Sequence, residues 1–141
     1  MFARSGDPFG TLLELQRALE SRHTSDWLRG STAASGTFPP INIFQQGENF
    51  VAIVELPGID RNQLKIEAKE NRIRVSGEKT VSYNEGVSLH RRERVSGVFD
   101  RTLSVPVRID ADKIKAEYRD GILALSIPRA ESDKPRAIAI N

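Results

Sequence analysis

Apolar or aromatic residues recur at every second position through the segment 114–127, on either side of an interruption at Asp120-Gly121. That dipeptide favours a type I′ turn, because both central positions of the turn need a positive φ. The resulting hairpin places six apolar or aromatic side chains on one face, in the pairs Ile114–Ile127, Ala116–Leu125 and Tyr118–Leu123. A slip of one residue would turn this whole set outward, so the pattern defines the register. The hairpin is predicted to form half of a sandwich core.

A second hairpin is predicted around Glu70-Asn71. It gives the apolar-face pairs Ala68–Ile73, Ile66–Val75 and Leu64–Gly77. On its other face Glu67 lies opposite Arg74, an opposite-charge pair of the kind that stabilises a sheet modestly. Two hairpins with one apolar face each indicate two stacked sheets.

Eight short segments have the composition of strands: 41–44, 50–56, 64–68, 73–76, 87–91, 98–105, 114–118 and 122–127. Turn-forming residues separate them, which is typical of an all-β antiparallel sandwich. The stretch 79–96 is too long for an ordinary hairpin loop. Its strand around Val87 and Leu89 therefore either pairs within the chain or is exchanged between identical subunits.

The first 29 residues have a helical pattern instead. Asp7-Pro8 suits a helix start, and Thr11-Leu-Leu-Glu14 fits a capping box. Leu12, Leu15 and Leu19 recur at helical spacing up to a predicted end at Ser21 or Arg22. Such a helix either covers its own domain or belongs to a mobile apolar arm that packs between subunits or onto other proteins. We favour the arm, which the small-residue segment 30–36 links to the sandwich.

The last 14 residues predict an extended tail. After Ile127 the chain is polar and contains Pro128 and Pro135, so it is expected to be solvated. In an extended conformation Ile138 and Ile140 point to the same side, which suits docking beside an exposed sheet edge. Ten residues from Arg129 would reach about 30 Å, far enough for another molecule. Folding of the tail onto its own domain is the alternative.

Composition excludes several classes of protein. The net charge of +2 is too small to indicate nucleic-acid binding, and acidic residues interrupt the basic run near His90. The chain has no cysteine, and no apolar run approaches the length of a membrane span. We therefore expect a cytoplasmic protein with no stable membrane insertion.

The residues do not predict an enzyme. His23 and His90 lie on different segments, so they form no cluster for metal or triad chemistry. No glycine-rich phosphate cradle is present. Hairpin geometry accounts for Glu117 and Asp120, the one apparent carboxylate pair. We expect no catalytic residue, no metal and no cofactor.

Four motifs resemble those of the small heat-shock proteins. The segment 116–123, Ala-Glu-Tyr-Arg-Asp-Gly-Ile-Leu, is similar to the A-x-x-x-n-G-V-L signature that closes their α-crystallin domain. Glu-Leu-Pro-Gly-Ile at 55–59 resembles D-L-P-G-V, with Glu in place of Asp. The segment 99–106 resembles F-x-R-x-x-x-L-P, with Val105 where Leu is usual, and Ile138-Ala-Ile140 matches the I-x-I tail motif. The resemblance covers about residues 39–141, and it is the order of the four motifs that makes it specific.

This resemblance implies an all-β, immunoglobulin-like sandwich at 39–128, preceded by an arm and linker at 1–38 and followed by a tail at 129–141. It implies an ATP-independent, stress-related holdase that forms a large dimer-based homo-oligomer and binds partly unfolded client proteins. The tail residues Ile138 and Ile140 would dock in a groove of a neighbouring dimer, formed by Leu64, Ile66, Ala68, Ile114 and Ala116. The dimer would form by strand exchange through Val87, Leu89, His90, Arg91, Arg92, Glu93 and Arg94, with Arg101 near the interface. Clients would meet the arm residues Phe2, Phe9, Leu12, Leu13, Leu15, Leu19, Trp27 and Leu28.

One alternative function uses the same sandwich. A monomeric or dimeric co-chaperone, or adaptor, would bind one specific protein partner and would not assemble further. Size in solution separates the two, because an adaptor would elute near 16 kDa on gel filtration and a holdase at several hundred kDa.

Overall fold

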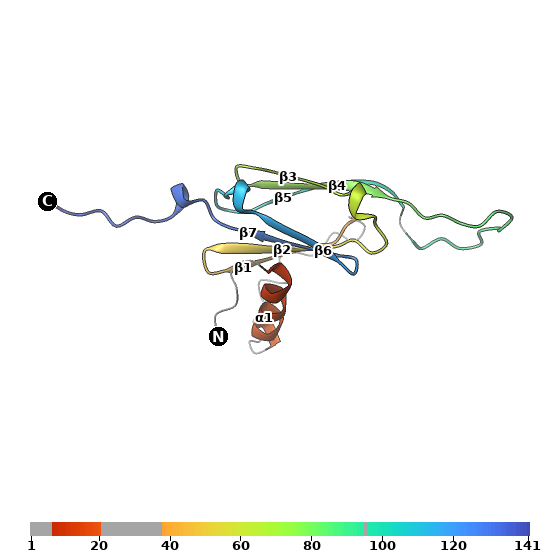
Figure 1. Cartoon of the computed structure of the whole chain (residues 1–141), viewed down its shortest axis with the longest axis horizontal. Helices are drawn as coiled ribbons and strands as arrows, with labels where there is room; N and C mark the ends of the chain where they lie inside the picture. Colours follow the sequence, from red (N-terminus) through yellow and green to blue (C-terminus); the bar gives the residue numbers. More distant parts are fainter. Residues whose placement is uncertain (1–6, 21–37, 95) are drawn as a thin grey trace.

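The structure is a computed structural model that describes residues 7–20, 38–94 and 96–141, with only the backbone for 16–20 (Figure 1). One helix precedes the strands: α1, Pro8–Glu20. The strands are β1 Ile41–Gln46, β2 Asn49–Glu55, β3 Lys65–Lys69, β4 Arg72–Lys79, β5 Gly97–Ser104, β6 Lys115–Arg119 and β7 Ile122–Ile127. Short 3₁₀ turns lie at η2 Arg61–Gln63, η3 Ala111–Lys113 and η4 Glu131–Asp133. Among these residues no helix is long and apolar enough to cross a membrane.

The strands form two antiparallel sheets packed face to face, in the orders β1-β2-β7-β6 and β3-β4-β5 (Figure 1). The core between them is entirely apolar. Its buried members come from both sheets and the loops between them: Phe50, Ala52, Val54, Leu56, Ile59, Ile73, Val75, Phe99, Leu103, Val105, Ile109, Leu123, Leu125 and Ile127. The prediction of an all-β antiparallel sandwich is confirmed.

Both predicted hairpins have the expected register. Tyr118 pairs with Leu123 across β6 and β7, and Ile66 pairs with Val75 across β3 and β4. Asp120 and Gly121 have φ values of 51° and 78°, as a type I′ turn requires. The outermost predicted pairs, Leu64–Gly77 and Ile114–Ile127, lie outside the paired strands, because β3 begins after Leu64 and β6 after Ile114.

The described residues between β4 and β5, 80–94 and Ser96, form no strand in the single chain, contrary to the predicted strand at 87–91. β4 and β5 pair over their full lengths, from Arg72–Ser104 to Lys79–Gly97. The residues from Ser82 to Arg94 between them are exposed, and Figure 1 shows them as a loop that projects from one end of the sandwich. Alternation alone predicted a strand here, but a strand also needs a partner edge.

The helix begins where Asp7-Pro8 indicated, but the predicted capping box is wrong. The Asp7 side chain accepts a hydrogen bond from the Phe9 backbone N–H at 3.0 Å and so caps the helix. Thr11 lies inside the first turn, where its hydroxyl donates to the Asp7 carbonyl at 3.1 Å. An Asp followed by Pro is sufficient to start a helix, because the Asp side chain caps the helix and Pro fits the first helical position.

Gly77 of β4 marks the closest packing in the smaller sheet. A Cβ there would lie 2.6 Å from the Gln63 carbonyl oxygen and 2.9 Å from Phe99 Cζ, both closer than real Cβ contacts. Gly77 pairs directly with Phe99, whose buried ring takes the space of the missing side chain. Glycine is therefore required at this position for steric reasons.

We expect Gly77→Ala to destabilise the fold by about 1–3 kcal/mol, because the added methyl overpacks a site bounded by backbone. Denaturant unfolding at one fixed protein concentration measures the change. Ser76→Ala is the matched control, since it alters the neighbouring residue on the other face of β4. Equal stabilities of the two variants would contradict the close packing at Gly77.

Candidate functional site

β3 and β6 are edge strands on the same side of the sandwich. The Arg101 Nη1 of β5 donates to the Pro39 carbonyl at 2.7 Å, and the Phe99 ring meets Phe38 edge-on at 5.6 Å. These contacts place β5 beside the chain that enters β1. Because β3 and β6 end their sheets opposite to β5 and β1, they share the other side.

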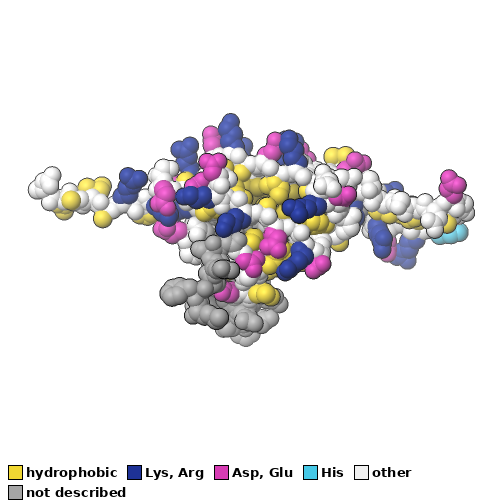
Figure 2. Space-filling view, in the orientation of Figure 1, with side chains coloured by type: hydrophobic (Ala, Val, Ile, Leu, Met, Phe, Trp, Pro, Cys, Tyr) yellow, Lys and Arg dark blue, Asp and Glu magenta, His cyan; other side chains and the backbone are white. Residues whose placement is uncertain are grey.

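An apolar surface lies between these two strands. We call it the β3–β6 edge surface, and it consists of the five residues predicted to accept the tail: Leu64, Ile66, Ala68, Ile114 and Ala116. Four of them are partly buried against the core, and Ala116 is exposed. Figure 2 shows hydrophobic side chains gathered in this region, with charged side chains on both sides of them. The structure therefore brings these five together, and whether they bind a tail stays a prediction.

Tyr118 closes one end of this surface and was not predicted as part of it. Its hydroxyl lies 2.7 Å from the Leu56 carbonyl oxygen and 3.0 Å from that of Ile59. It donates to these two acceptors and so joins β6 to the loop before β3. Its place on the apolar face of the predicted hairpin was the available signal.

The C-terminal tail has two parts. Residues 128–134 are held against the sandwich, and 135–141 are exposed. The Arg129 backbone N–H donates to Asn49 Oδ1 at 3.1 Å, and the Arg129 side chain donates to Asp133 at 3.2 Å. Lys134 pairs with Glu131 at 2.7 Å and approaches Glu48 at 3.8 Å. The expectation of a solvated chain from Pro128 is therefore correct only from Pro135, because the polar residues find local ionic partners.

Beyond this anchor the two isoleucines contact almost nothing. Ile138 is 89% exposed and Ile140 is 98% exposed. Figure 1 shows the tail running away from the sandwich, at the end opposite to the long loop. In this structure residues 129–134 of the predicted tail lie on its own domain, and the part from Pro135 onward does not fold onto it.

The loop residues predicted to take part in strand exchange are all exposed. Val87 and Leu89 are 60% and 55% exposed, and Val98 at the start of β5 is also exposed. Arg91 pairs with Glu93 at 3.0 Å, and Arg92 donates to Ser96 Oγ. His90 and Arg94 are likewise exposed. Their proposed role between subunits stays a prediction.

Arg101 has a role within the single chain that the sequence did not indicate. Its side chain bonds to the Pro39 carbonyl, and the neighbouring Phe38 ring lies beneath Lys79 Nζ, 5.4 Å from the ring centre. Pro39 is fully buried. Arg101 thus ties β5 to the start of β1.

The predicted arm residues divide into three groups. Phe9, Leu12 and Leu15 pack against the chain's own sheet, whereas Leu13 is 57% exposed. Phe2, Trp27 and Leu28 lie outside the described residues, and so does the Leu19 side chain. In the single chain the described helix covers its own domain, as the alternative predicted. Whether these residues also contact other subunits or clients stays a prediction. The covering is possible because outward residues of the sheet are apolar there.

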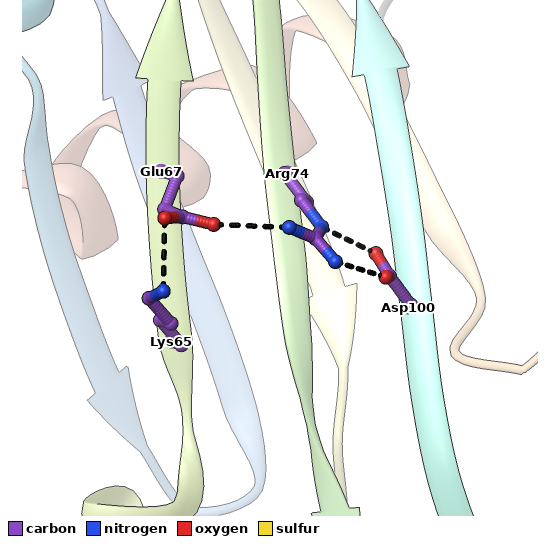
Figure 3. A network of polar contacts seen from close by, with 4 residues as sticks. All are labelled: Lys65, Glu67, Arg74 and Asp100. Atoms are coloured by element: carbon purple, nitrogen blue, oxygen red, sulfur yellow. Dashed lines mark hydrogen bonds and ion pairs between the residues drawn. The ribbon is translucent and has the colours of Figure 1, made fainter.

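Four charged side chains form a network across the outer face of the smaller sheet (Figure 3). Arg74 of β4 donates from Nε and Nη2 to the two oxygens of Asp100 on β5, the first at 2.8 Å. Its Nη1 lies 3.3 Å from Glu67 on β3, which also pairs with Lys65 at 2.9 Å. The predicted pair Glu67–Arg74 is confirmed, and Asp100 extends it across all three strands.

This network shifts the pKa values of Glu67, Arg74 and Asp100. Lys65, and secondly Arg74, hold the pKa of the Glu67 carboxyl below its ordinary value of 4.5. Hydrogen bonding to Arg74 lowers the pKa of Asp100 below 3.8, and Asp100 in turn raises the pKa of Arg74. All four side chains are exposed, so solvent screening keeps their contribution small.

The described residues offer surfaces for binding and no reaction centre. In the parts of the chain that the structure describes, no three His, Cys, Asp or Glu side chains gather as a metal site. Two open hollows of about 480 Å³ and 510 Å³ are lined by strand residues around Gly77 and by the loop bases around Pro57 and Lys79. Neither includes His90. Exposed apolar edges, loops and tails are the features of a protein that acts through contacts.

Comparison with known proteins assigns the chain to a family. Residues 42–141 match the model of the Hsp20/alpha crystallin family. The 18 kDa antigen 1 of Mycobacterium intracellulare is 40% identical over 109 residues, covering 77% of this chain and 72% of that protein. The 18 kDa heat shock protein of Streptomyces albus G is 31% identical over 135 residues, covering 95% and 89%.

Solved structures show the same fold. Heat shock protein 16.0 from Schizosaccharomyces pombe superimposes with a TM-score of 0.60 at 30% identity, covering 73% of this chain and 97% of that one. A small heat-shock protein from Xylella fastidiosa gives 0.59 at 32% identity, covering 73% and 95%. The chain belongs to the Hsp20/alpha crystallin family, the small heat-shock proteins. The resemblance to small heat-shock proteins that the four motifs indicated is therefore confirmed. The members of this family are chaperones and not enzymes.

The charged network predicts a pH dependence. A carboxyl whose pKa is lowered by folding stabilises the folded state above its ordinary pKa, and this stabilisation is lost as the pH falls through the lowered value. We expect the thermal midpoint of unfolding to decrease as the pH is lowered below about 4. Asp100→Asn should lower stability at pH 7 and weaken that dependence. Asp112→Asn, which removes an exposed carboxylate outside the network, is the control, and identical pH profiles of the two variants would contradict the role of Asp100.

Proposed function

We propose that this chain is an ATP-independent holdase that binds partly unfolded proteins and works as a large dimer-based homo-oligomer. The observation that carries this proposal is the pair of exposed isoleucines, Ile138 and Ile140, on a tail that leaves its own sandwich. Isolated exposed apolar residues are common, but two on the same side of an extended peptide form a docking motif. Family membership supports a chaperone role.

The tail anchor favours docking on another molecule. With residues 128–134 held by Asn49, Arg108 and Glu48, the free tail begins at Pro135. The four residues from Pro135 to Ile138 reach at most about 14 Å. A return to the β3–β6 edge surface of the same chain would require a reversal within this short stretch. The edge surface of a second copy is the complementary site.

Each tail contact is expected to be weak. Burying two isoleucines yields about 3–6 kcal/mol before the cost of ordering the tail is subtracted. Many simultaneous contacts hold an assembly through high effective concentration, while each one opens and closes readily. Opening frees the β3–β6 edge surface, and unfolding proteins expose the apolar segments and strand edges that fit it.

The long loop is the proposed dimer element. Residues 87–94 are exposed, and Val87 and Leu89 alternate with polar residues, so this segment is suited to a strand that has a partner. Pairing with an edge of an identical sandwich would supply that partner and cover Val87 and Leu89. Non-native client proteins and further copies of this chain are the partners, and the proposed location is the cytoplasm.

Holdase activity is tested by heating an aggregation-prone protein with the full chain in the absence of nucleotide. We expect light scattering to fall as the chain approaches equimolar amounts, with the client recovered in soluble complexes. A client that precipitates at the same rate with and without the chain would contradict the proposal. A single species near 16 kDa on gel filtration would favour the adaptor function instead.

The tail is tested by Ile138→Ser combined with Ile140→Ser. We expect the large particles to fall to dimers or small oligomers, because the apolar contribution of each tail is removed. The matched control is Ala137→Ser with Ala139→Ser, which changes the alternate side of the same peptide. Mass measurement by light scattering compares the two, and full-sized particles from the isoleucine variant would rule out tail docking.

A further inference from the structure

The outer face of the four-stranded sheet is apolar, although it points away from the sandwich core. All five residues from Phe50 to Val54 of β2 are buried, which means that both faces of the strand are covered. Phe50, Ala52 and Val54 belong to the core, whereas Val51 and Ile53 point outward. An antiparallel sheet that faces water carries polar residues outside. This face is therefore built for contact.

We call this surface the outer apolar face. Its members come from three adjacent strands of the sheet: Phe44, Val51, Ile53, Ile122 and Ala124. Val51 is 2% exposed, and Ala124 is fully buried. Face residues of a sheet become this inaccessible only beneath another element.

That element is α1 of the same chain, which packs mainly against β7, β6 and β2 (Figure 1). Phe9, Leu12 and Leu15 lie three residues apart and so share one side of the helix. The Arg119 guanidinium lies 4.6 Å from the centre of the Phe9 ring, a cation–π contact at the rim of the face. The face thus recognises an amphipathic helix with large apolar residues at three-residue spacing.

On the helix side, the residues that make the contact are only partly buried. Phe9, Leu12 and Leu15 remain half-buried, while the sheet residues beneath them are almost inaccessible. α1 has 13 residues, and helices of this length are marginal in water without a packing partner. Of the described α1 side chains, Phe9, Leu12 and Leu15 pack on the face, and the helical state of so short a segment depends on that packing.

We propose that the outer apolar face is a second client-binding surface, one that takes amphipathic helical segments of non-native proteins. α1 occupies it until such a segment replaces the helix. The identity of the replacing partner rests on the proposed holdase function, but the existence of the surface does not. Replacement also exposes the apolar side of α1, so a single exchange fills one apolar site and frees a second.

The test displaces α1 and measures a helical probe. Leu12→Asp places a charge on the covering side of α1 and leaves the sandwich unchanged. Leu13→Asp makes the same change on the exposed side, one residue away, and is the matched control. The probe is a fluorescent synthetic peptide of residues 7–20. We expect it to bind the full-length Leu12→Asp chain at least tenfold more tightly than the Leu13→Asp chain, measured by fluorescence anisotropy.

Adding Ile53→Gln to the Leu12→Asp chain identifies the surface. Among the residues that the structure describes, those of α1 pack over Ile53 on the outer side, so glutamine there is expected to be solvated once the helix has left. We expect probe binding to be lost while the circular dichroism of the sheets is retained. Equal binding of the probe to the Leu12→Asp and Leu13→Asp chains, or binding unaffected by Ile53→Gln, would overturn the proposal.

Hydrogen exchange on the unmodified chain gives a second measurement that needs no substitution. An excess of probe peptide should accelerate exchange of the α1 amides and leave the β4 amides protected. Unchanged α1 exchange, or α1 amides that are already unprotected without peptide, would contradict the role of α1 as resident occupant. Neither measurement uses client aggregation, so failure of the holdase activity is distinguished from failure of this surface.

Discussion

Face-to-face packing of two open sheets is the constraint from which the other features of this molecule follow. The packing buries one apolar side of each sheet and leaves four strand edges and two outer faces unprotected. Charge covers one of these faces, through the network around Arg74. A helix covers the other. The edges β3 and β6 stay open, and an apolar surface lies between them.

Local patterns predicted the parts of the fold that depend on local physics. The turn at Asp120-Gly121 and the cross-strand pair Glu67–Arg74 are set by backbone conformation and by residues directly opposite each other, so both are readable from the chain. The tail isoleucines were found for the same reason, because period-two spacing survives without any partner. The start of α1 at Asp7 was equally local.

Contacts between distant residues were not predictable in this way. Arg101 bonds to a carbonyl 62 positions earlier, and Arg129 bonds to Asn49 80 positions earlier. Nothing in the neighbourhood of either arginine distinguishes it from a solvated one. The covered outer face of the four-stranded sheet, however, could have been predicted from the sequence. The uninterrupted apolar run 50–54 is the mark of a strand buried on both sides.

The anchor at Arg129 has a geometrical consequence for any assembly built through the tail. From Pro135 to Ile140 only six residues are free, a span of about 20 Å when fully stretched. Neighbouring sandwiches must then stand at a narrow range of separations, and the anchored segment gives each link a preferred direction. A particle connected by such short, oriented tail segments has a defined curvature, whereas one connected by long flexible linkers would not.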